Sequence, residues 1–209
     1  MANDLAGLNA FLDAQLNDAA NTVWPSADKD NVITWAVAGL YPHISRVIDP
    51  STATIDLTPG TYFYTLPTGV LNVSRVEYIN TAGDEVGSLA NGSWELVGDP
   101  LLGTHLLHVS PSITDADGTL RVHGYGRYNV TTNLIPDEYV PLVLAMARAE
   151  LYRRTAGDRV RYQEWMSRQQ VQNVSVNELM QFVNEADREA ARLRSQYRTW
   201  QRPVPGRVP

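Results

Sequence analysis

Residues 61–79 read TYFYTLPTGVLNVSRVEYI, and this stretch decides where the chain forms β-structure. It is rich in aromatic and β-branched side chains, which favour strands, and it is interrupted at Pro67 and Gly69, which favour a turn. The stretch therefore predicts two strands separated by a turn. Because Val73 and Val76 do not alternate cleanly along the second strand, we expect a β-bulge between them.

The same composition continues on both sides of this stretch, from Ala53 to Tyr128. Short runs that favour strands alternate with breakers rich in Gly, Pro, Asn and Asp, and the further runs are ATIDL, SWELV, HLLHV and TLRVHGYG. This alternation indicates an antiparallel β domain of about five to seven short strands. We place the domain at residues 53–130.

Residues 1–52 carry helical patterns, with apolar side chains at steps of three and four. The first stripe comprises Leu5, Leu8, Leu12, Leu16, Ala19 and Val23. Trp24 should end that helix, because the residue before a proline is pushed out of the α region. A second helix carries the stripe Val32, Ala36, Leu40, Ile44 and Val47. Pro42 should kink or shorten it.

Helical patterns return over residues 131–200. Ile135-Pro136-Asp137-Glu138 is a strong helix start, because proline and carboxylates suit the first turn. Its expected buried face comprises Val140, Val143, Leu144, Ala147 and Leu151, and a further helix should cover residues 159–172. Ser175 and Glu178 form a capping box that opens a last, extended helix. Residues 201–209 read QRPVPGRVP and form a proline-rich tail with no core of its own.

These patterns predict a mixed α+β fold. Helices from both chain ends would form a bundle, and the antiparallel β domain would be inserted between them. The expected parts are N-terminal helices at residues 1–52, the β domain at 53–130, C-terminal helices at 131–200 and an extended tail at 201–209.

Charge is divided unevenly along the chain. Residues 1–140 carry 5 basic and 16 acidic side chains, a balance of −11, whereas residues 141–209 carry 12 Arg and 7 acidic side chains, a balance of +5. Such a chain can present opposite potentials to its partners, and copies of itself are candidates. The basic residues comprise 16 arginines and a single lysine, Lys29. This excess of arginine reflects either the base composition of the genome or packed polar interfaces, to which Arg is better suited than Lys.

Several protein classes are disfavoured by composition. The chain has no cysteine, so it has neither disulfides nor thiolate metal sites. Its longest apolar run, Leu142–Ala147, is far shorter than the roughly 20 residues of a membrane span. The N-terminus lacks the basic region of a signal peptide, so we expect synthesis in the cytoplasm.

No catalytic, metal or cofactor site is expected. His105 and His108 are three residues apart on a predicted strand, which places them on opposite faces. The segment Asp115–Gly118 lacks the glycine and glutamate positions of a calcium loop, so it favours a hairpin turn. Gly124-Tyr125-Gly126 lacks the third glycine and the following helix of a dinucleotide loop.

Two features allow alternative interpretations. The aromatic side chains Tyr62, Tyr64, Trp94 and Tyr125 could stack on sugars, although core and cross-strand pairs are the commoner role. The arginine-rich helices could bind phosphate, but acidic residues are interspersed at helical spacing, as in Glu189 and Arg192. That spacing favours a solvated face with intrahelical ion pairs over a nucleic-acid track.

Two short motifs resemble the head–tail connector (adaptor) proteins of tailed bacteriophages, including the tail-tubular type. The first is Tyr64-Thr-Leu66-Pro67 leading into Val70–Tyr78, and the second is Leu134-Ile-Pro136-Asp137-Glu138-Tyr139 at a helix start. Between them come a Trp94–Gly98 strand and a strand ending in GYGRYN. The order of elements agrees with that of the family over about residues 5–200. The similarity of motifs is confined to about residues 60–150. The N-terminal helices cannot be matched to the family residue by residue.

The resemblance implies a structural virion protein and no enzyme. It implies a homo-oligomeric ring, typically of twelve copies, that binds the portal protein and a tail or stopper protein while DNA passes through without sequence-specific binding. The location would be the head–tail interface of the virion, with no membrane and no cofactor. We expect Trp200, Arg202 and Arg207 to contact the portal, because Trp and Arg are good interface anchors. The alternative is a carbohydrate-binding module on a virion or cell-surface structure.

Overall fold

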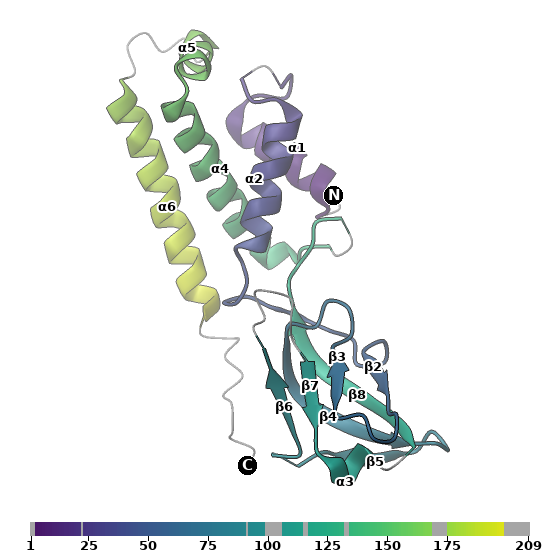
Figure 1. The fold of residues 1–209 in the computed structure, drawn as a ribbon. Coiled ribbons are helices and arrows are strands. Elements are labelled where there is room, and N and C mark those ends of the chain that lie inside the picture. Colours follow the sequence, from purple (N-terminus) through teal and green to yellow (C-terminus); the bar gives the residue numbers. More distant parts are fainter. Residues whose placement is uncertain are drawn as a thin grey trace. The chain divides into compact units, whose positions relative to one another are not determined.

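The computed structural model describes residues 3–21, 23–90, 92–98, 106–114, 117–131, 134–168 and 175–198. The chain divides into two compact units (Figure 1). Of the described residues, the helical unit comprises those up to Ile44 and those from Tyr128 to Arg198, and the β unit comprises Ser45–Arg127. The mixed α+β class expected from the sequence is confirmed.

The helical unit is organised around one central helix. Its elements are α1 (Leu5–Leu16), α2 (Ser26–Ala38), the 3-10 turn η2 (Asp137–Tyr139), α4 (Val140–Gly157), α5 (Arg159–Arg168) and α6 (Val176–Arg198). Within this unit α4 lies between α6 and α2 (Figure 1). It can do so because apolar side chains surround it, and Leu142, Val143 and Ala147 are all fully buried.

Both N-terminal helices are shorter than predicted. The first was expected to reach Trp24, but α1 ends at Leu16, because Asn17 takes a left-handed conformation with φ 51°. The second was expected to include Val47, but α2 ends at Ala38. Val47 instead belongs to a strand and is 70% exposed, so its place in the apolar stripe was a coincidence of spacing.

The β unit contains two antiparallel sheets. The larger sheet has the order β1-β8-β4-β5, with β2 also paired to β8, and the smaller sheet has the order β3-β7-β6. The strands are β1 (Arg46–Val47), β2 (Thr54–Asp56), β3 (Phe63–Thr65), β4 (Asn72–Asn80), β5 (Glu85–Ser88), β6 (Trp94–Val97), β7 (Leu106–Val109) and β8 (Gly118–Gly126). A short helix, α3 (Pro111–Thr114), follows β7.

One apolar core joins the two sheets. Val76 and Val122 of the larger sheet and Leu107 of the smaller sheet are fully buried in the same cluster. The predicted bulge in β4 is confirmed, since its register with β8 shifts between Val73 and Arg75. That shift places Val73 and Val76 on the same buried face although they are three residues apart.

The GYG motif of β8 is explained by close packing. A Cβ on Gly126 would lie 2.1 Å from the carbonyl oxygen of Gly69, and a Cβ on Gly124 would lie 2.6 Å from that of Asn72. Both glycines therefore allow the neighbouring backbone to approach β8, which is a structural role.

Two details of the β prediction were wrong. The described residues form eight strands, and two of these, β1 and β5, were not predicted from the sequence. The segment before Gly118 was expected to form a hairpin turn, yet β7 and β8 belong to different sheets. β8 instead pairs with β1, β2 and β4, which lie far earlier in the chain, and the local turn signal does not report such distant partners.

Candidate functional site

The predicted helix start before α4 ties the N-terminus to the helical unit. The side-chain amide of Asn3 donates to the carbonyl oxygen of Ile135, 2.8 Å away, and to the carboxylate of Asp137. In return, the backbone N–H of Ile135 donates to the carbonyl of Asn3. Ile135 is fully buried, so this short motif fixes two distant parts of the chain to each other.

Three tyrosines beside this helix start hold the end of α6. The ring of Tyr139 lies 6.0 Å from that of Tyr128 and 5.2 Å, edge to face, from that of Tyr197. The Tyr197 hydroxyl also donates to the backbone carbonyl of Glu138. Burial, reinforced by Glu138, raises the pKa of Tyr139, so its hydroxyl stays neutral. Tyr197, the last residue but one of α6, thereby attaches the end of that helix to the start of α4.

Lys29 is the centre of a buried polar network between α1 and α2. Its side chain is completely buried, and its ammonium group forms an ion pair with Asp13 and another, 3.2 Å long, with Asp18. It also donates to the carbonyl of Asp18 and to the side chain of Asn21. The Asp18 carboxylate accepts from the backbone N–H groups of Val23 and Trp24. This network fixes the α1–α2 connection and explains why α1 ends early.

Ion pairs join α6 to α4. Arg148 donates to Glu189 at 2.5 Å, and Arg153 donates to Asp187 at 3.0 Å. The sequence had predicted pairs inside α6, as between Glu189 and Arg192. Within the described residues, the ion pairs of α6 are made with α4. The charged side chains of α6 therefore help to hold it against α4 as well as to solvate its exposed face.

A second buried charge lies on the outer face of the larger sheet. Glu77 on β4 is 2% exposed and pairs with Arg75, with Arg121 at 3.7 Å and with His123 at 2.8 Å. Burial by itself opposes ionisation of this carboxyl, but the hydrogen bond and charge of His123, with both arginines, lower the pKa of Glu77 below its usual value. Sequence reasoning missed both Lys29 and Glu77 as network centres, although the single lysine was a signal.

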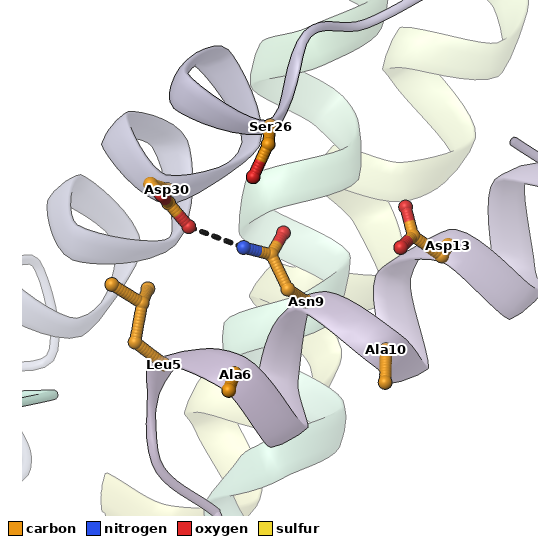
Figure 2. Close-up of a pocket in the computed structure, with 7 residues that line it drawn as sticks. All are labelled: Leu5, Ala6, Asn9, Ala10, Asp13, Ser26 and Asp30. Carbon is orange, nitrogen blue, oxygen red and sulfur yellow. Dashed lines mark hydrogen bonds between the residues drawn. The ribbon is translucent and has the colours of Figure 1, made fainter. Parts of the chain in front are cut away.

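A groove lies between α1 and α2, with a volume of about 470 Å³. Figure 2 shows its lining, which comprises Leu5, Ala6, Asn9, Ala10, Asp13, Ser26 and Asp30. The Asn9 amide donates to the carboxylate of Asp30, a contact that bridges the two helices. The alanines give the groove a small-residue floor, and the carboxylates give it a negative rim.

The sequence-predicted aromatic residues do not form one platform. Tyr64 faces the core, 7% exposed, and its hydroxyl donates to the carbonyl of Thr61 at 2.8 Å. Trp94 is half-buried against the same core, and Tyr125 lies on the other sheet. Tyr62, 38% exposed, is the most accessible of the four. As a stacking residue, Tyr64 was therefore wrongly chosen, because its ring is covered by the core.

The remaining candidate residues are placed as follows. His108 lies beside Glu95, with 3.3 Å between Nδ1 and Oε1, and its ring lies 4.8 Å from that of Phe63, tilted by 35°. His105, Asp115 and the proposed portal contacts Trp200, Arg202 and Arg207 lie outside the described residues. In the parts of the chain that the structure describes, no cluster of three acidic or histidine side chains is arranged to hold a metal. No helix in those parts is long and apolar enough to cross a membrane.

Residues 4–174 match the family model described as SU10 adaptor protein. The chain belongs to this family. It is a family of phage head–tail adaptors, which are structural proteins of the virion and not enzymes. A comparison with curated proteins found no match.

Membership in the SU10 adaptor protein family gives the geometry a context. The match includes α1, α2, the whole β unit, α4 and α5, and therefore also the N-terminal helices that had no likeness of motif. It ends before α6. The tyrosine contacts and ion pairs that attach α6 to α4 consequently lie at the border between the family region and the rest of this chain.

Proposed function

We propose that this adaptor assembles into a ring of twelve copies between the portal protein and a tail or stopper protein. DNA passes through the ring without sequence-specific binding. Membership in the family supports the adaptor role. The ring, its protein partners and the passage of DNA are what we propose beyond that role.

One observation carries the portal contact. The last turn of α6 is attached to α4 through Tyr197 and Tyr139, so the chain leaves the helical unit from a fixed position. The following residues include Trp200, Arg202 and Arg207, and residue types like these are enriched among the anchors of protein interfaces. A fixed exit lowers the conformational entropy lost when such anchors bind. We assign the portal contact to these three residues.

The charge distribution suits a DNA channel. A channel wall that repels phosphate lets DNA slide without being trapped, and the balance of −11 over residues 1–140 supplies negative charge. The β unit shares this sign, with 4 Arg against 9 acidic residues between positions 45 and 127.

The test uses the full chain mixed with the portal protein of the same phage. Mass measurement and negative-stain imaging should show a ring bound to the portal. Deleting residues 198–209 should abolish portal binding while the helical content stays unchanged, because the deletion removes no described core residue. Replacing Trp200, Arg202 and Arg207 together by alanine should have the same effect. Portal binding that survives both changes would refute the assignment of the contact.

A further inference from the structure

The groove between α1 and α2 carries negative charge that the described part of the chain does not neutralise. Asp13 and Asp18 share Lys29 as their cation, which leaves one negative charge among the three. Asp28 pairs with Arg161. Within the described residues, Asp30 accepts from the neutral amide of Asn9 and forms no ion pair, so it adds a second negative charge at the rim.

The groove also contains an acceptor that lacks a donor. The Oδ1 atom of Asn9 is buried, and within the described residues it has no hydrogen-bond partner. A buried polar atom without a partner destabilises the chain that holds it. A guanidinium group, which has five N–H donors and no acceptor, would satisfy Asn9 and pair with Asp30 at the same time. The chemistry of the groove therefore fits an arginine side chain.

The helical unit presents suitable arginines on α6. Arg188 and Arg192 are exposed and four residues apart, so they lie on one face of the helix. Like charges at this spacing destabilise an isolated helix. Glu189, the acidic residue between them, is already paired with Arg148 of α4. Neither guanidinium forms an ion pair with the rest of the described chain, so both are available to a partner.

The two surfaces lie on different sides of the central helix. α4 contacts α6 on one side and α1 and α2 on the other, and Figure 1 shows the three layers of this unit. One copy therefore cannot place its own α6 arginines in its own groove. Two complementary surfaces at different places on one molecule make a head-to-tail interface, which closes into a ring if the rotation between copies permits.

We propose that Arg188 and Arg192 on α6 of one copy dock into the α1–α2 groove of the next copy, where they pair with Asp30 and Asn9. This inference rests on the proposed ring and names the surfaces that close it. The groove volume of about 470 Å³ is in the range of clefts that hold a ligand, and it accommodates a long side chain above Ala6 and Ala10.

The test reverses each charge in the full chain and then mixes the variants. Asp30→Arg and Arg192→Asp should each abolish the ring, measured by mass photometry with the portal protein present. An equimolar mixture of the two should restore it. In the mixture the two variants alternate around the ring. Arg192 of the Asp30→Arg variant then pairs with Asp30 of the Arg192→Asp variant at every second interface, and the two substituted residues pair with each other at the remaining interfaces. Ring formation should also weaken as salt concentration rises, because the contact is electrostatic.

Three controls make the outcome specific. Glu164→Arg reverses an exposed charge on α5 of the same unit and should leave the ring intact. Ala10→Arg fills the groove without removing any of its hydrogen bonds and should abolish the ring, which covers the case that Asp30→Arg fails to fold. Circular dichroism melting of every variant shows which of them are folded.

The possible outcomes separate the two proposals. If the wild-type chain forms no ring, with or without portal, the proposed function fails and this inference fails with it. If the wild-type ring forms and persists in Asp30→Arg, Ala10→Arg and Arg192→Asp, the ring stands and the groove assignment is wrong. The assignment is also wrong if the reversals break the ring but their mixture does not restore it.

Discussion

Each of the two units has a polar network centred on one buried charged side chain, and the two central charges are of opposite sign. In the helical unit Lys29 is completely buried and serves two carboxylates. In the β unit Glu77 is 2% exposed and is served by three basic groups whose side chains are 25–53% exposed. The network of the helical unit therefore depends on a single cation, Lys29. In the β unit, three basic side chains share the neutralisation of Glu77.

This difference teaches where each unit is vulnerable. Loss of Lys29 would leave Asp13 and Asp18 without a cation, and Asp18 is nearly fully buried. The partners of Glu77 can be hydrated if the carboxylate is lost, because each retains contact with solvent. Desolvation therefore makes the lysine network the more sensitive of the two.

The largest effect is expected for Lys29→Met, which keeps the side-chain length and removes the charge. It should lower the free energy of unfolding of the helical unit by about 3–5 kcal/mol, because it leaves an uncompensated buried carboxylate. Urea denaturation measures the loss, and hydrogen exchange shows which unit opens. The β unit should keep its protection. A loss under about 1 kcal/mol would mean that water already reaches this network.

A smaller effect is expected for Glu77→Gln, about 1.5–3 kcal/mol, the usual value of hydrogen bonds to a charged group. This variant also tests pH dependence. The pKa of Glu77 is lower in the folded chain than its reference value of 4.5, so the ionised group stabilises the β unit above pH 4.5. That contribution is lost as pH falls through the folded pKa. Melting curves of wild type and variant should therefore converge below pH 4.5, whereas parallel curves would contradict the shift.

The smallest effect is expected for Arg75→Ala. Its side chain is 53% exposed, and Arg121 and His123 continue to neutralise Glu77 after its loss. The free energy of unfolding should fall by about 0–1 kcal/mol, as for other exposed pairs. Hydrogen exchange of β4 and β8 measures it. A loss as large as that of Glu77→Gln would show that Arg75 alone supports the carboxylate and that the network has no redundancy.

Several local features were predictable from sequence. The capping box of α6 forms as expected, since the Ser175 N–H donates to Glu178 and the Glu178 N–H donates to the Ser175 hydroxyl. The bulge in β4 also lies where Val73 and Val76 break the alternation. Each of these depends on residues a few positions apart, whose geometry the backbone itself fixes.

The partners of charged residues were not predictable in the same way. Glu189 was assigned to Arg192 by helical spacing, yet it pairs with Arg148, 41 residues away. Glu77 meets His123 and Arg121 only because β4 and β8 pair in one register. Spacing rules describe a single element in water, and they carry no information on which element will lie beside it.

The sequence by itself determined the order of helices and strands, the main breaks between them and the resemblance to phage adaptors. These follow from periodicity, caps and turn residues, which act within a few positions of the chain. The tertiary structure alone decided that α1 ends at Leu16, that the strands divide into two sheets, and that the only lysine is buried. Each of these depends on contacts between residues far apart in the chain, and their burial free energy exceeds local preference.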